Sequence, residues 1–63
     1  MPVAQLDQLR NLVSLVIEKH GIRAPSVAQH TALRARRDGD LERAMTWDEV
    51  ARLAEAALRD PEA

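Results

Sequence analysis

Cysteine, phenylalanine and tyrosine are all missing from this 63-residue chain, which has a single tryptophan. Without cysteine, the chain can form no disulfide bond and offers no thiolate ligand to zinc. Its two histidines, His20 and His30, lack the spacing of a metal-binding pair, so we expect no metal and no other cofactor. A chain this short buries only about 60% of its unfolded surface and is marginally stable alone. Its stability must come from very good helix packing or from self-association.

An excess of charge of one sign is also missing, since nine basic residues face ten acidic ones, for a net charge of −1. This balance argues against a strongly basic nucleic-acid binder and against an acidic mimic of nucleic acid. No apolar run is long enough to span a membrane, and the opening "MPVAQLDQL" has no basic segment of a signal peptide. We therefore expect a soluble, cytoplasmic protein with its native start and no membrane contact. Eight arginines against one lysine suggest a bacterial source.

The hydrophobic content of 46% is typical of a folded chain, and its spacing is helical from the start. Over residues 3–20, apolar side chains recur every three or four positions. Gly21 then ends this helix. We expect Gly21 in the left-handed conformation, with Ile22 folding back onto Ile17 as in a Schellman motif.

A second helix is predicted over residues 25–37. Ala24 precedes Pro25 and is expected to be pushed out of the helical conformation. The helix starts either with Pro25 at its first position or with Ser26 as its cap. Ser26 and Gln29 have the spacing of a capping box, which favours Ser26. The helix then ends at the turn signal around Gly39.

The third helix has a problem of phase. Trp47, Val50 and Leu58 share one helical face, but a helix extended back to Asp40 places Leu41 and Met45 on its charged face. One solution is a break near Met45, with a short turn at 40–45 and a helix over 46–59 capped by Thr46 and Glu49. The other is one long helix from Asp40, with a second surface covering Leu41 and Met45. The capping box favours the first solution.

The expected fold is all-α, a small three-helix bundle that fills a single domain over residues 1–63. Its helices span about 3–20, 25–37 and 46–59, and 60–63 form a frayed tail. Trp47 is expected to anchor the core, although an exposed binding residue is the alternative. The predicted core residues are Leu6, Leu9, Val13, Val16, Ile17, Val27, Val50, Leu53 and Leu58.

Two candidate surfaces emerge. Apolar residues that do not fit the core face indicate a self-association interface in a homodimer, made by Leu15, Leu41, Met45 and Trp47. A basic stripe at helical spacing suits phosphate or an acidic partner, although Asp38 and Asp40 follow it directly and cancel its long-range field. This candidate anion or nucleic-acid patch consists of His30, Arg34, Arg36 and Arg37.

Catalysis is not expected. No serine lies in a context that would activate it, and three short helices leave little room for a substrate pocket. We therefore expect neither an enzyme nor a small-molecule substrate.

Several turn and core motifs resemble those of a known family. "HGIRAPSVA", Gly39-Asp40, and Trp47 followed by Val50-Ala51 are similar to signatures of a family of short helical bacterial proteins without an assigned function. The signatures are His-Gly, Ala-Pro, Gly-Asp and Trp-x-x-[Ile/Val]-Ala, and they cover roughly residues 18–58. The resemblance implies an all-helical fold, one long helix after the Gly-Asp turn, and no active site. The capping box at Thr46 departs from that long helix.

The sequence thus favours a non-enzymatic protein-binding or adaptor module that acts on a protein partner or on a second copy of itself. Two alternatives stay open. One is a small nucleic-acid-associated regulator that uses the arginine stripe, and the other is an inhibitor protein carried by a phage or plasmid.

Overall fold

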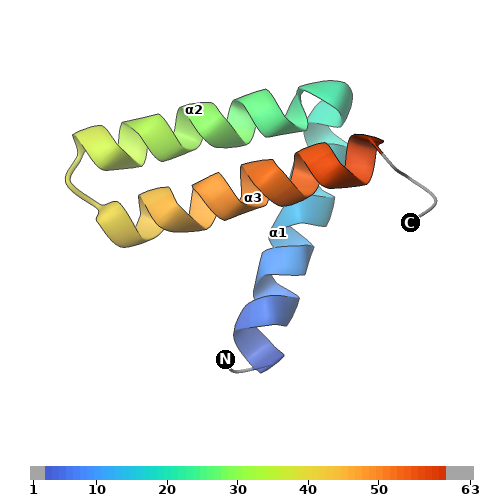
Figure 1. The fold of residues 1–63 in the computed structure, drawn as a ribbon, viewed down its shortest axis with the longest axis horizontal. Coiled ribbons are helices and arrows are strands. Elements are labelled where there is room, and N and C mark those ends of the chain that lie inside the picture. The colour runs from blue at the N-terminus through green and yellow to red at the C-terminus, as the bar shows by residue number, and fades with distance from the viewer. Residues whose placement is uncertain (1–2, 60–63) are drawn as a thin grey trace.

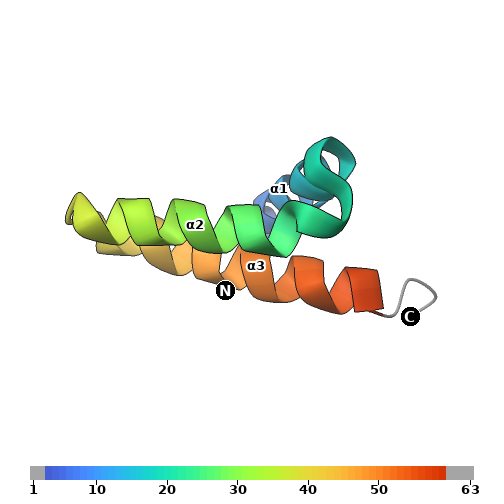
Figure 2. The same ribbon diagram turned by 90° about the horizontal axis from the view of Figure 1, so that it is seen from above.

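The computed structural model describes residues 3–59, with side chains from Asp7 onward. The described chain is helical throughout apart from the turns, and Figure 1 shows helices α2 and α3 side by side as an antiparallel hairpin. Helix α1 crosses this pair near one end, and its N-terminal half extends beyond the hairpin (Figures 1 and 2). The elements are α1 (Val3–His20), the 3-10 turn η1 (Gly21–Arg23), α2 (Ala24–Arg37) and α3 (Leu41–Arg59).

The all-α class is confirmed, whereas the three-helix bundle is not. A bundle requires each helix to run alongside its neighbours at a small angle. Helices α2 and α3 meet this condition, and α1 does not, because it meets the pair only where it crosses them (Figure 1). Within 3–59, no helix combines the length and the apolar character needed to cross a membrane.

The buried face of each hairpin helix is made almost entirely of alanine. Every buried residue of α2 is an alanine, and in α3 Val50 is the exception. Alanine side chains let two helix axes come close together, but each contributes little apolar area. We call the seven residues of this surface the alanine seam: Ala24, Ala28, Ala32, Ala35, Ala44, Ala51 and Ala54.

The turn between α2 and α3 is fixed by a Schellman motif. Gly39 has a positive φ of 81°, and its N–H donates to the carbonyl of Arg36 at 3.1 Å. The N–H of Asp40 donates to the carbonyl of Ala35 at 2.9 Å, which completes the pair of hydrogen bonds that defines the motif. The side chain of Asp40 then caps α3, because its Oδ1 accepts from the N–H of Arg43 at 3.1 Å.

The predicted break near Met45 is wrong, and the alternative of one long helix is correct. Thr46 is an interior residue of α3, and its hydroxyl donates to the carbonyl of Glu42 at 3.1 Å. It therefore caps nothing. Asp40 wins over Thr46 as the cap because it directly follows the glycine that ends α2, so the helix gains more than a turn of backbone hydrogen bonds. The helix over 46–59 and the separate turn at 40–45 are thus a single element.

Two substitutions test this helix start. Asp40→Ala should lower the free energy of unfolding by about 1 kcal/mol, because an N-cap is lost. Thr46→Ala should be neutral or slightly stabilising, since alanine is the better helix former at an interior position. Urea denaturation of both variants gives the sign of each change in the free energy of unfolding. A lower free energy of unfolding for Thr46→Ala, together with no change for Asp40→Ala, would indicate that the helix starts at Thr46 instead.

The junction between α1 and α2 also differs from expectation. Gly21 is left-handed, as predicted, with φ 59°. Ile22 is 86% exposed, however, so it does not fold back onto Ile17. The chain continues through η1 instead, and the N–H of Ala24 donates to the carbonyl of Gly21.

Helix α2 therefore starts earlier than predicted. Ala24 is helical and fully buried despite the proline after it, which shows that burial outweighs the local restriction on a residue before proline. Pro25 lies in the first turn, where its missing N–H leaves no helical hydrogen bond unmade. Ser26 is exposed and lies inside α2, so the predicted cap at Ser26 is wrong.

The core is smaller than the sequence suggests. Val13, Val16 and Val50 are buried as predicted. The other predicted core residues whose side chains are described are only partly buried, and the side chain of Leu6 lies outside the described residues. The partly buried ones are Leu9, Ile17, Val27, Leu53 and Leu58.

Candidate functional site

The four residues predicted as an interface do not form one surface. Trp47 is partly buried and packs against the core, as expected of an anchor. Leu15 is exposed on α1. Leu41 and Met45 are exposed one helical turn apart on α3, so they share a face. Of the four predicted interface residues, only Leu41 and Met45 lie on the same face of a helix.

An ion pair joins the Leu41–Met45 face to α2. Arg36 Nη2 lies 2.6 Å from Asp48 Oδ2, and both side chains are about half exposed. Asp48 follows Met45 by three positions, which makes the two residues neighbours on α3. The ion pair therefore borders the apolar pair and bridges the two helices of the hairpin.

Leu33 of α2 lies beside this ion pair. It precedes Arg36 by three positions, so the two are neighbours on that helix, and it is 55% exposed. Sequence reasoning missed Leu33. The same test of phase that placed Leu41 would have found it, because Leu33 lies off the helical face of the buried alanines. We call this surface the hairpin patch, made by Leu33, Arg36, Leu41, Met45 and Asp48.

The predicted basic stripe is divided by the structure. Arg36 is engaged with Asp48 on α3. His30, Arg34 and Arg37 are exposed on α2, at the helical spacing that places them on one side. The four residues are therefore not a single basic patch.

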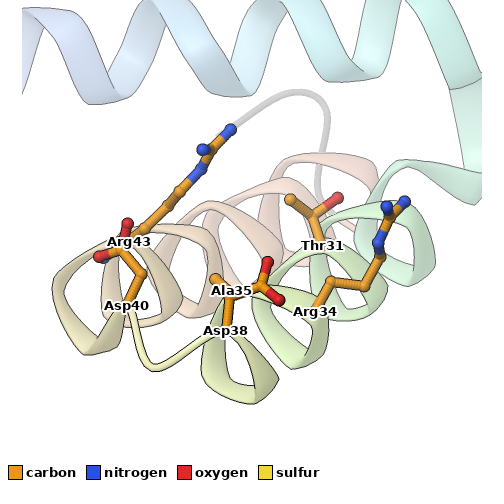
Figure 3. Close-up of a pocket in the computed structure, with 6 residues that line it drawn as sticks. All are labelled: Thr31, Arg34, Ala35, Asp38, Asp40 and Arg43. Carbon is orange, nitrogen blue, oxygen red and sulfur yellow. The ribbon is translucent and has the colours of Figure 1, made fainter.

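Arg34 lines an open recess of about 300 Å³ at the turn end of the hairpin (Figure 3). Figure 3 shows Arg34 rising from α2 and Arg43 from α3, with the side chain of Asp38 between them. The two arginines and the two aspartates that line the recess cancel in charge. The recess therefore lacks the positive field that would favour a phosphate. Its lining residues are Thr31, Arg34, Ala35, Asp38, Asp40 and Arg43.

Two further ion pairs lie along the exposed side of α3. Arg59 Nη2 is 2.8 Å from Glu55 Oε1. Arg52 pairs with Glu49, whose hydrogen bond and negative charge raise the pKa of the guanidinium above its ordinary value.

Among the described residues, no three histidine, aspartate or glutamate side chains gather closely enough to hold a metal ion. In that part of the chain, no buried side-chain nitrogen or oxygen lacks a hydrogen-bond partner.

No protein-family model matches the chain, and neither a curated protein nor a solved structure matches it. The function must therefore be inferred from the chain's own surfaces.

Proposed function

We propose that this chain is a non-enzymatic protein-binding module that associates with a second copy of itself. The observation that carries the proposal is the mismatch between its core and its surface. Among the described residues, the largest fully buried side chain is that of Val50, while five larger hydrophobic side chains are more than half exposed. These are Leu15, Ile22, Leu33, Leu41 and Met45.

The energetics favour a partner. Burial of apolar surface contributes roughly 25 cal/mol per Å², so a core of alanine and valine yields less than one of leucine. The chain has no disulfide to compensate, because it has no cysteine. A partner that binds only the folded state would add to the stability by mass action. The proposal keeps the cytoplasmic, bacterial setting expected from the sequence.

Self-association should make thermal stability depend on concentration. The melting temperature should rise as the protein is taken from low to high micromolar concentration, because the dimer stabilises the folded chain. Circular dichroism melts at several concentrations, with sedimentation equilibrium beside them, measure both quantities. A monomer at high micromolar concentration, with one melting temperature throughout, would reject self-association.

A nucleic-acid-associated regulator is the second candidate, and the exposure of His30, Arg34 and Arg37 favours it. Asp38 and Asp40, which line the same recess as Arg34, weaken it. A salt titration of binding to duplex DNA separates the two candidates, because phosphate contacts give an affinity that falls steeply with salt. An inhibitor carried by a phage or plasmid is a form of the leading proposal in which the partner is a host protein.

A further inference from the structure

The hairpin patch lies on the side of α3 that faces away from α1. Val50 and Ala54 follow Leu41 and Met45 by nine positions, which is half a revolution of an α-helix. Val50 and Ala54 belong to the core cluster that includes Val13 of α1. Helix α1 therefore covers one side of the hairpin and leaves the patch on the other side uncovered.

The charges of the patch are self-complementary. Arg36 and Asp48 give it one positive and one negative charge, both about half exposed. In a contact between two identical surfaces related by a two-fold axis, each residue i that meets j is matched by j meeting i. Arg36 of one copy can then approach Asp48 of the other, and the same contact repeats across the axis. A strongly acidic or strongly basic partner would find no such match.

Resting on the proposed self-association, we propose that a second copy docks on the hairpin patch through a two-fold contact. Leu33, Leu41 and Met45 of the two copies form its apolar centre, and the two Arg36–Asp48 pairs flank it. Two α2–α3 hairpins then pack face to face as four helices, an arrangement that stable helical bundles use. The two α1 helices lie on the outer sides of this assembly.

A charge placed in the patch should separate the copies. Met45→Glu should weaken the dimer by about 100-fold or more, because it would bury a carboxylate in the apolar centre while Arg36 is already paired with Asp48. Leu15→Glu is the matched control, since Leu15 is also an exposed apolar residue of a helix, at 60% against 70% for Met45. It should leave the dissociation constant within a few-fold of that of the original protein. Sedimentation equilibrium gives both constants, and circular dichroism shows whether each variant is folded.

A second experiment decides the question even if Met45→Glu fails to fold. Since the chain has no cysteine, one introduced cysteine reports on a single position. Met45→Cys and Leu41→Cys should give a covalent dimer with a short bis-maleimide, whereas Leu15→Cys and Ile22→Cys should give several-fold less. More cross-linking at Leu15 or Ile22 than in the patch would overturn the docking surface.

The outcomes separate this inference from the proposed function. A dimer that Met45→Glu leaves intact, or that cross-links through α1, keeps self-association and rejects the patch. A chain that is monomeric at high micromolar concentration rejects both. Loss of the dimer with Met45→Glu but not with Leu15→Glu, together with cross-linking at Met45, supports both.

Discussion

Ala54→Leu is expected to lower the free energy of unfolding by about 3 kcal/mol, the upper end of the usual cost of overpacking a core. Ala54 is fully buried within the cluster where α1, α2 and α3 meet. A leucine there needs space that the close approach of the helices does not leave, so it must push them apart. Because small domains are marginally stable, such a loss removes much of the folded population.

Ala56→Leu is the matched control. Ala56 lies in the same helix two positions later and is exposed. The substitution is chemically the same, and alanine and leucine are both good helix formers, so the change should be within about 0.5 kcal/mol of neutral. Urea denaturation of the two variants gives the difference. Equal stability of both variants would mean that Ala54 does not lie in a close contact between helices.

Trp47→Ala should cost about 3 kcal/mol, the lower end of the range for deleting a core aromatic side chain. Trp47 is the one aromatic residue of the chain, and it packs against the core while partly accessible. Its fluorescence should therefore be blue-shifted in the folded protein and move to the red on unfolding. Trp47→Phe should retain most of the stability, because it keeps an aromatic ring in the same space.

Trp47→Ala also distinguishes the two roles that the sequence allows for this residue, a core anchor and an exposed binding residue. Trp47 lies outside the hairpin patch, so its loss should reduce the stability of the fold rather than the affinity between correctly folded copies. Sedimentation and denaturation of Trp47→Ala together measure both effects. A variant with unchanged stability and no dimer would make Trp47 an interface residue instead of an anchor.

Helical periodicity predicted the helical segments of the chain. Their ends were harder to predict because several local signals compete there. Gly21 and Gly39 both adopt positive φ, but the chain turns back after Gly39 with Schellman hydrogen bonds, whereas after Gly21 it continues through η1 into α2. Asp40 and Thr46 are both good caps by residue type. Asp40 is the cap because it directly follows the turn at Gly39. The capping-box pattern did not include this position relative to the turn.

The core and the hairpin patch could each be predicted only in part, because both depend on how the helices pack against one another. Ranking residues by hydrophobicity placed large side chains inside, whereas the close approach of α2 and α3 decides burial and favours alanines such as Ala28 and Ala32. The misfit of Leu41 and Met45 was visible as a conflict of phase. The pairing of Arg36 with Asp48 was not, because it depends on how the two helices lie against each other.

The alanine seam has a consequence for the entropy of folding. Alanine has no side-chain rotamers to lose, whereas each buried leucine or isoleucine loses about 0.5–1 kcal/mol of rotamer freedom. The seven buried alanines therefore order the hairpin at almost no cost in side-chain entropy. The favourable free energy from apolar burial is small, and so is the opposing loss of side-chain entropy. The hairpin thus forms with little apolar area of its own, and the larger side chains that it does not bury stay on its surface.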